Sequence, residues 1–312
     1  MKRIILSLWL ASLTLGLAGC SSGVDERSGP PRVALVLKTL NHPFFIDMKA
    51  GAEEAAARLG LELIVQAAER ELDVEKQMQI VENLLQTQID VLCLTPSGSR
   101  ELIPAIKKAN QAGIPVVTID TRVDTSSAPG LAIETFVGSD NYQGGQLAGE
   151  YIVEKLGQAK VAILEGIPGH ETGDARLRGF RDAVAGIEGI EIVASQPANW
   201  ERDQGFTVFQ NMLQAHPDID TLFACSDLMA LGAMEAIAAA GQEDRIRVIG
   251  FDALEEAREA IEQGRMLASI AQFPGEMGRI AVESAHRLLQ GQKLAETLPV
   301  KIELVTKSEG GQ

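Results

Sequence analysis

Residues that could bind or transform a small polar molecule recur in this sequence directly after short apolar runs. Two adjacent aromatics, Phe44 and Phe45, come soon after the first such run at 33–37. The positions that follow the later runs are polar, and they include Thr95, Asp120, His170, Arg176, Ser226, Asp227, Asp252 and Gln272. Charged groups and amides hydrogen-bond to hydroxyls, and aromatic rings cover apolar C–H faces. With Trp200, the set favours a small polyhydroxyl ligand.

Recognised catalytic motifs are missing from these positions. No G-x-S-x-G nucleophile elbow follows a predicted strand, and the sequence contains neither H-E-x-x-H nor the phosphate loop G-x-x-x-x-G-K-[ST]. Its Cys and His residues do not cluster at metal-ligand spacings. We therefore expect a binding protein, not an enzyme, and we expect no cofactor and no metal ion.

The elements that must position these side chains alternate regularly. Apolar runs of strand length are followed by helical stretches, a pattern typical of right-handed βαβ units around a parallel sheet. Strands are expected near 33–37, 61–65, 90–94, 115–119, 134–137, 160–164, 190–194, 220–224, 246–250 and 267–271. In an open α/β fold the residues after such strands share one crevice at the carboxyl ends of the sheet. The predicted fold class is doubly wound α/β.

The series of alternating strands and helices divides into two halves. The segment 121–130 (TRVDTSSAPG) is polar and turn-rich, so we expect the chain to leave a first sheet there. A second βα series follows. A helix near 274–290 and a strand from Val300 to Val305 are also expected, and the pattern alone assigns them to neither half.

Composition limits the classes of partner. The 312 residues include 46% hydrophobic side chains, enough for one or two large cores. The formal net charge is −15. Because nucleic-acid binding needs clustered Lys and Arg, we expect no nucleic-acid partner.

The N-terminus is typical of an export signal. Lys2 and Arg3 precede an apolar run at 4–17 that is shorter than a membrane-spanning helix requires, so a transmembrane anchor is the weaker alternative. The ending Leu-Ala-Gly-Cys resembles a bacterial lipoprotein cleavage box, which would make Cys20 the lipidated first residue of the mature chain. Residues 21–31 would then form a polar tether, and the protein would be held at a membrane surface.

The other two cysteines, Cys93 and Cys225, lie within predicted strands. We expect small buried hydrophobic residues, although an oxidising compartment would also permit a disulfide.

Several motifs, in order, give the chain from about residue 32 to 307 a resemblance to the periplasmic ribose-binding proteins of the type I sugar-binding superfamily. They are TLNHPFF at 39–45, ANQA at 109–112, GSDN at 138–141, VIGFD at 248–252 and IAQ at 270–272. The resemblance implies two lobes joined by three crossings, 32–139 with 272–300 and 140–271 with 301–309. It also implies a monomeric receptor that traps a monosaccharide or polyol and passes it to the permease and ATPase of an ABC importer.

The resemblance also implies a ligand site. Its predicted residues are His42, Phe44, Phe45, Thr95, Asp120, His170, Arg176, Trp200, Ser226, Asp252 and Gln272. The chain departs from the ribose-binding pattern at His42, where an Asn is usual, and at Thr95 and Ser226, which replace amides. Thr121 replaces an Arg. The spacing from His170 to Arg176 is similar to that of glucose/galactose-binding proteins. Pentose, hexose and polyol ligands all stay open.

Local structure offers a plainer role for most of these residues. Phe44 and Phe45 could belong to the core, and Trp200 could pack ahead of a helix. Asp120, Asp227 and Asp252 could cap helices. Arg176 could lie on a helix surface, His42 and His170 in ordinary loops, and Gln272 against a crossing segment. A sensory receptor that docks on a chemoreceptor or kinase is the alternative function.

Overall fold

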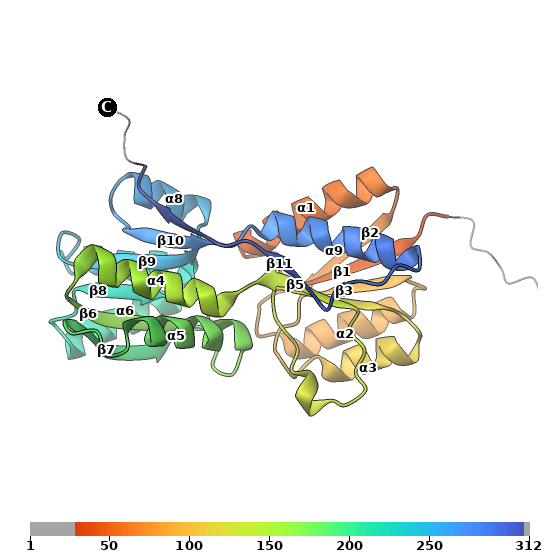
Figure 1. The fold of residues 1–312 in the computed structure, drawn as a ribbon, viewed down its shortest axis with the longest axis horizontal. Coiled ribbons are helices and arrows are strands. Elements are labelled where there is room, and N and C mark those ends of the chain that lie inside the picture. The colour runs from red at the N-terminus through yellow and green to blue at the C-terminus, as the bar shows by residue number, and fades with distance from the viewer. Residues whose placement is uncertain (1–28, 309–312) are drawn as a thin grey trace, which may run out of the picture. The chain divides into compact units, whose positions relative to one another are not determined.

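The computed structural model describes residues 29–308. The predicted signal peptide, Cys20 and most of the predicted tether lie outside these residues. Two six-stranded sheets carry the fold (Figure 1). The first sheet has the strand order β11-β5-β4-β3-β1-β2, and the second has the order β12-β10-β9-β8-β6-β7. The expected doubly wound α/β architecture with two lobes is confirmed.

The strands of the first sheet are all parallel to their neighbours. They are β1 (Arg32–Thr39), β2 (Glu62–Ala68), β3 (Val91–Leu94), β4 (Val116–Ile119), β5 (Thr135–Ser139) and β11 (Thr297–Val300). The second sheet contains β6 (Ala159–Glu165), β7 (Ile190–Pro197), β8 (Thr221–Ala224), β9 (Arg247–Asp252), β10 (Ala268–Ala271) and β12 (Glu303–Thr306). Of these, β12 pairs antiparallel with β10.

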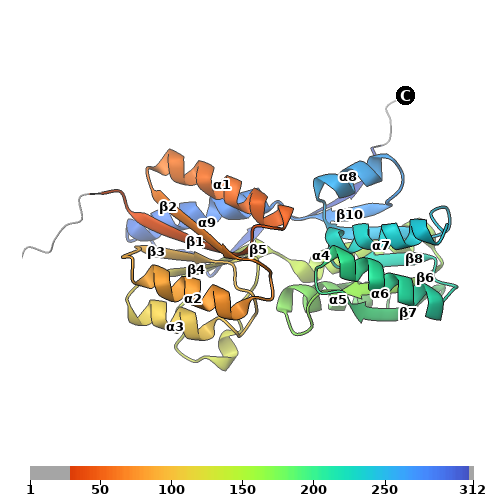
Figure 2. The same ribbon diagram turned by 180° about the vertical axis from the view of Figure 1, so that it is seen from behind.

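Helices cover both faces of each sheet (Figures 1 and 2). Around the first sheet they are α1 (Pro43–Leu59), α2 (Val74–Leu85), α3 (Ile103–Gln111) and α9 (Pro274–Leu289), with a short 3-10 turn η1 (Thr125–Ser127). Around the second they are α4 (Asn141–Leu156), α5 (Glu171–Val184), α6 (Arg202–Ala215), α7 (Asp227–Ala239) and α8 (Glu255–Glu262).

Strand β1 shows why the first sheet needs helices on both sides. Val33, Leu35 and Leu37 pack in the cluster formed with α1 and α9, whereas Ala34 and Val36 pack in the cluster formed with α2 and α3. All five side chains are fully buried. Because neighbouring residues of a strand point to opposite faces, an unbroken apolar run is what a doubly covered strand requires.

The chain passes between the two sheets three times. The passages run from β5 to α4, from β10 to α9, and from β11 to β12. The predicted single strand from Val300 to Val305 is wrong. Val300 ends β11 in the first sheet, Lys301 and Ile302 cross over, and Glu303 begins β12 in the second. Alternating apolar residues continue through the crossing, so the sequence pattern did not reveal the break.

Two further features concern the described residues alone. No helix within 29–308 combines the length and the apolar character needed to cross a membrane. Cys93 and Cys225 are free and buried, in strand β3 and just after strand β8, so they belong to different sheets and do not form a disulfide.

Candidate functional site

A cavity lies where the carboxyl ends of strands from both sheets face each other. The cavity is narrow: about 30 Å³ of it is open to the centres of water-sized molecules. Its lining residues are Lys38, His42, Phe44, Phe45, Glu71, Asp120, His170, Thr172, Arg176, Trp200, Ser226, Asp252 and Gln272.

All the predicted ligand-site residues within the described chain line this cavity, except Thr95. Thr95 follows β3 as expected, but its side chain is fully buried and its hydroxyl lies 3.6 Å from the sulfur of Met48 in α1. Its carbonyl accepts a hydrogen bond from the side chain of Gln77. Thr95 therefore supports the loop behind the cavity wall.

Three lining residues were not predicted. Lys38 is the penultimate residue of β1, Glu71 lies in the loop between β2 and α2, and Thr172 is in the first turn of α5. Lys38 directly follows the first apolar run, so its position was a usable signal. Nothing in the local sequence around Glu71 distinguishes it from the charged residues beside it.

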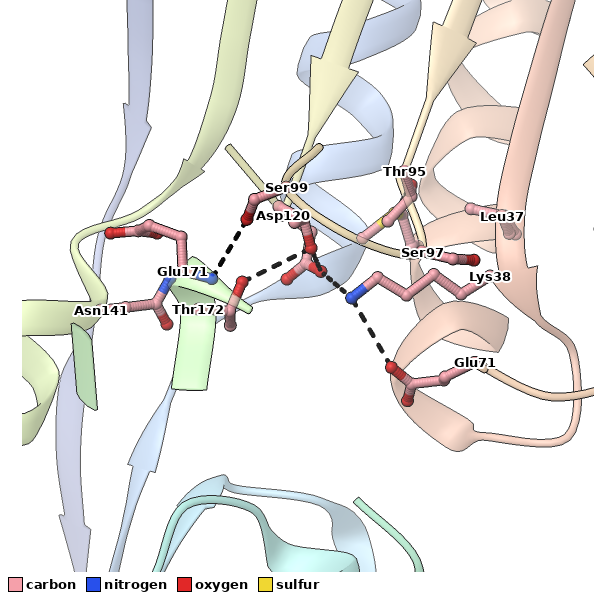
Figure 3. Close-up of polar contacts among 12 residues, drawn as sticks. Leu37, Lys38, Glu71, Thr95, Ser97, Ser99, Asp120, Asn141, Glu171 and Thr172 are labelled. Atoms are coloured by element: carbon pink, nitrogen blue, oxygen red, sulfur yellow. Dashed lines mark hydrogen bonds and ion pairs between the residues drawn. The ribbon is translucent and has the colours of Figure 1, made fainter. Parts of the chain in front are cut away.

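A charged cluster forms the wall contributed by the first sheet (Figure 3). The ammonium of Lys38 lies 3.1 Å from Asp120 Oδ2 and 3.6 Å from Glu71 Oε2. Although burial opposes its charged form, the carboxylates of Asp120 and Glu71 raise the pKa of Lys38. Burial raises the pKa of Glu71, against the opposing effect of Lys38. The three side chains together hold one cation between two acidic groups.

Arg176 dominates the opposite wall. Its Nε donates to Asn141 Oδ1 at 2.8 Å, and its Nη1 donates to the carbonyl of Cys225 at 2.6 Å. Its guanidinium carbon lies 3.8 Å from the ring centroid of Phe251. Helices α4 and α5 approach closely here, since a Cβ on Gly145 would lie 2.0 Å from the carbonyl oxygen of Arg176. Buried contacts thus fix Arg176 at 3% exposure, so it is not a surface residue.

Asp252 and Gln272 complete this wall. Gln272 donates to Asp252 Oδ1 at 2.6 Å, and Arg176 Nη1 lies 3.5 Å from the same oxygen. Burial raises the pKa of Asp252 to about 7 despite the nearby Arg176. Gln272 is 1% exposed, and its Oε1 is buried without a hydrogen-bond partner. An unpaired buried acceptor beside a cavity is suited to a donor supplied by a ligand.

The aromatic residues serve the core and the cavity at once. Phe44 and Phe45 pack edge to face, with ring centroids 5.3 Å apart, and both belong to the core of the first sheet as well as to the cavity lining. Trp200 lies with its ring centroid 5.5 Å from the guanidinium carbon of Arg176. Its indole rests against Gly166, where a Cβ would lie 2.0 Å from the ring. Only glycine leaves room for the indole at that position.

Three cavity residues have unusual backbone conformations. Asp120, Trp200 and Asp252 adopt φ values of 62°, 68° and 111°. Positive φ is unfavourable for non-glycine residues and persists where the surroundings hold it, often at functional sites. Neither aspartate caps a helix, since α8 has Leu254 at its N-cap and the turn η1 has Asp124.

His42 and His170 lie at the N-caps of α1 and α5. The Nδ1 atom of His42 accepts a hydrogen bond from the backbone N–H of Phe44 at 3.1 Å, and Pro43 occupies the first helical position. Burial, with help from Lys38, lowers the pKa of His42 to about 4 and lowers that of His170. Both imidazoles are neutral near pH 7.

Asp227 was considered as a helix cap, and this interpretation is wrong. Ser226 is the N-cap of α7, and it lines the cavity, whereas Asp227 does not. Asp227 accepts hydrogen bonds from Leu254 N and Ser269 Oγ, both at 2.8 Å. These two hydrogen bonds hold Asp227 against the segment that follows Asp252 and against β10.

Direct contacts join the two lobes beside the cavity. The hydroxyls of Thr121 and Thr172 lie 3.4 Å apart. The backbone N–H of Glu171 donates to Ser99 Oγ at 3.1 Å (Figure 3). Thr121 also donates to Asp120 Oδ2 at 3.1 Å. These contacts hold the two lobes together beside the cavity, which presents hydrogen-bond donors, acceptors and aromatic faces.

Comparison with known proteins also indicates a binding protein. A family profile described as "Periplasmic binding protein domain" matches residues 33–293. The chain is 38% identical over 299 residues to the ribose import binding protein of Escherichia coli, covering 96% of this chain and 98% of that protein. It is 34% identical over 271 residues to the D-allose-binding periplasmic protein of the same species, covering 86% of each.

Solved structures that are similar to this chain are also those of binding proteins. A periplasmic solute-binding protein from Actinobacillus succinogenes with bound D-allose has a TM-score of 0.85 at 39% identity, over 89% of this chain and 98% of that chain. A Caulobacter myo-inositol-binding protein has a TM-score of 0.83 at 31% identity, over 91% and 96%. The relatives are binding proteins, not enzymes. Because the family profile, the relatives and the fold all agree, the chain belongs to the periplasmic binding protein family.

Proposed function

We propose that this protein captures a neutral monosaccharide or polyol in the cavity and delivers it to an ABC importer. The observation that carries the proposal is the facing pair of walls: Asp120 and Lys38 come from the first lobe, and Arg176 and Asp252 come from the second. A sugar hydroxyl both donates and accepts hydrogen bonds, so it can pair with either kind of group. The relatives named for ribose and D-allose support this ligand class.

The cavity contains the groups to hold such a ligand on both its polar rim and its apolar face. Phe44, Phe45 and Trp200 would cover C–H faces of a sugar ring. The free Oε1 of Gln272 would accept from one hydroxyl, and the carboxyl groups of Asp120 and Asp252 would accept from others. His42, His170 and Ser226 would add further polar contacts. The structures that contain D-allose and myo-inositol are of relatives that bind a monosaccharide and a cyclic polyol.

Release of the ligand requires the lobes to separate. We propose that 32–139 with 272–300 and 140–271 with 301–309 move as two rigid bodies about the three crossings. The contacts from Thr121 to Thr172 and from Ser99 to Glu171 would then form on closure. Outside the described residues, we propose that Cys20 is lipidated and holds the monomeric protein at the outer side of a bacterial membrane. A phase-partition assay comparing the full-length chain with a Cys20→Ala variant tests this anchor.

Isothermal titration of the purified protein tests the proposed ligand class. The panel is D-ribose, D-allose, D-glucose and myo-inositol. We expect at least one to bind with a Kd near micromolar, about 8 kcal/mol of binding free energy. An absence of heat for every member, with folding confirmed by circular dichroism, would reject a monosaccharide or polyol receptor.

A further inference from the structure

Another hollow lies in the second lobe, at the end of its sheet that is remote from the cavity (Figure 1). We call it the distal groove. It lies where two strands begin, since Arg247 is the first residue of β9 and Leu267 directly precedes β10. The cavity residues Asp252 and Gln272 lie at the other ends of the same two strands. The distal groove is therefore separate from the sugar site.

The distal groove has two connected arms. About 520 Å³ of one arm and about 330 Å³ of the other are open to the centres of water-sized molecules. The side chains that line both arms are Glu243, Ile246, Val248 and Arg265. A molecule bound in the groove can therefore extend from one arm into the other, with the guanidinium of Arg265 at the junction.

The larger arm, which we call the basic arm, carries an excess of positive charge. Its basic side chains are Lys155, Arg247, Arg265 and Lys307, and its one carboxylate is Glu243. Within residues 29–308 none of these four cations forms an ion pair, and the two arginines donate only to a backbone carbonyl and a side-chain amide. Unpaired cations that gather along one hollow attract an anion. This arm contrasts with the net charge of −15 for the whole chain.

The smaller arm, which we call the apolar arm, offers aliphatic contacts. Its apolar side chains are Leu231, Met234, Ile237, Ala238, Ile246 and Val248. Its two further carboxylates are already paired with Arg202, Glu235 at 2.6 Å and Glu256 at 2.7 Å. The charge left unpaired along the distal groove is therefore mostly positive, and it lies beside an aliphatic surface.

The distal groove is poorly suited to a sugar or to an extended peptide. Four buried side-chain polar atoms within 29–308 have no hydrogen-bond partner, and none of them belongs to a residue of the groove. Strands β9 and β10 each have a neighbouring strand on both sides, so a peptide cannot add a strand there. Charge and apolar contact are what the groove offers to a ligand.

We propose that the distal groove binds an anionic amphiphile with one unbranched acyl chain, of which a fatty acid is the simplest example. The carboxylate would face Arg265, which can bind both of its oxygens, and the other cations of the basic arm. The acyl chain would lie against Met234 and Ile237 in the apolar arm. This site adds a second ligand class to the protein and does not depend on the sugar site.

Calorimetric titration of the purified protein with three probes tests the ligand class. Decanoate should bind at least tenfold more tightly than hexanoate, because hexanoate lacks four methylenes that would be buried. It should also bind at least tenfold more tightly than decyltrimethylammonium, which has the same chain length and the opposite charge. Absence of decanoate binding, or equal affinity for decanoate and decyltrimethylammonium, would overturn the proposal.

Paired variants locate the binding site. Ala238→Phe should weaken decanoate binding at least tenfold by filling the apolar arm, whereas Ala239→Phe, next to it on α7 and outside the groove, should not. Both alanines are exposed, so either variant should fold.

A second pair of variants tests the charges. Arg265→Gln with Lys307→Gln should weaken decanoate binding at least tenfold. Lys76→Gln with Lys107→Gln removes the same charge from exposed positions on α2 and α3 and should leave the affinity unchanged. Wild-type decanoate affinity in both groove variants would place the amphiphile elsewhere and overturn the proposal. Equal weakening in the groove and control variants would show that binding is non-specific, with the same consequence.

Discussion

At the scale of single residues, the cavity combines groups that a folded protein buries only when they are paired. Lys38, Arg176 and Asp252 are each under 10% exposed, and each has an opposite charge within 4 Å. Removing one member leaves its partner desolvated and unpaired. Substitutions at these positions should therefore affect binding much more than substitutions on the neighbouring surface.

Arg176→Ala should weaken ligand binding by roughly 2–4 kcal/mol, about 30- to 1,000-fold in Kd, since it leaves Asp252 without its cation and the ligand without a donor. Asp120→Ala should cause a loss of similar size. Isothermal titration measures both. Arg178→Ala is the matched control, because Arg178 lies on the same helix with a largely exposed side chain. Unchanged affinity in Arg176→Ala would remove this residue from the site.

Binding should also weaken as the pH falls through 7. The pKa of Asp252 is raised to about 7, mainly by burial, so its carboxyl group takes up a proton below that pH and no longer accepts freely from a ligand hydroxyl. Arg176 opposes this rise in the pKa of Asp252, whereas Asp120 and Glu71 favour it. Burial and the charge of Asp252 also raise the pKa of the neighbouring Asp227. The Kd should rise by roughly tenfold per pH unit below 7.

Titrations at pH 5.5, 6.5 and 8 measure this dependence. The pKa of His42 is lowered to about 4, mainly by burial, so His42 stays neutral through this range and adds little to the dependence. Asp252→Asn should bind more weakly at pH 8 and show a flat profile. A wild-type profile that is flat from pH 5.5 to 8 would contradict the link to Asp252.

At the scale of elements, close packing of backbone against side chain sets where the aromatic wall lies. Gly166 follows β6 and supports the indole of Trp200. Gly166→Ala should displace the indole, because a Cβ there would lie 2.0 Å from the ring, and binding should weaken by tenfold or more. Gly173→Ala should have a smaller effect, since its Cβ would lie 3.0 Å from the same ring.

Fluorescence and titration together measure this prediction. Trp9 lies in the predicted signal peptide, so a chain that begins after it contains Trp200 as its single tryptophan. Its emission should shift in Gly166→Ala more than in Gly173→Ala. Wild-type emission and affinity in Gly166→Ala would show that the indole does not depend on that glycine.

The sequence predicted most elements because each strand that is covered on both faces is a plain apolar run, such as Val33 to Leu37. Residues at the ends of those runs were also predictable, and Asp120 and Asp252 are examples. Glu71 was not, because what distinguishes it is an ion pair with Lys38, which lies far from it in the chain. The division of the last strand was hidden for a similar reason: β11 and β12 pair with strands from different sheets, and the local pattern does not encode partners.

At the scale of the whole molecule, ligand binding and the relative position of the lobes are coupled through the contacts between the lobes. Thr172→Val and Ser99→Ala each remove a hydrogen bond between the lobes, which contributes about 0.5–1.5 kcal/mol to the closed form. Each should raise Kd by about two- to tenfold, mainly through faster release. Ser126→Ala changes an exposed hydroxyl and should leave the release rate unchanged.

Stopped-flow release measurements distinguish the variants. Small-angle scattering of the wild type, with and without ligand, should show a smaller radius of gyration in the bound form. Equal release rates for wild type, Thr172→Val and Ser99→Ala would mean that these contacts do not retain the ligand.

The order of the elements along the chain has a consequence for biogenesis. The first hydrophobic core includes Met277, Ala281 and Val300 from α9 and β11, although its first strand begins at Arg32. A ribosome must therefore synthesise almost all of the second lobe before the first can finish folding. A nascent chain with this layout stays incompletely folded for most of its translation, which is the condition that passage through a secretion channel demands.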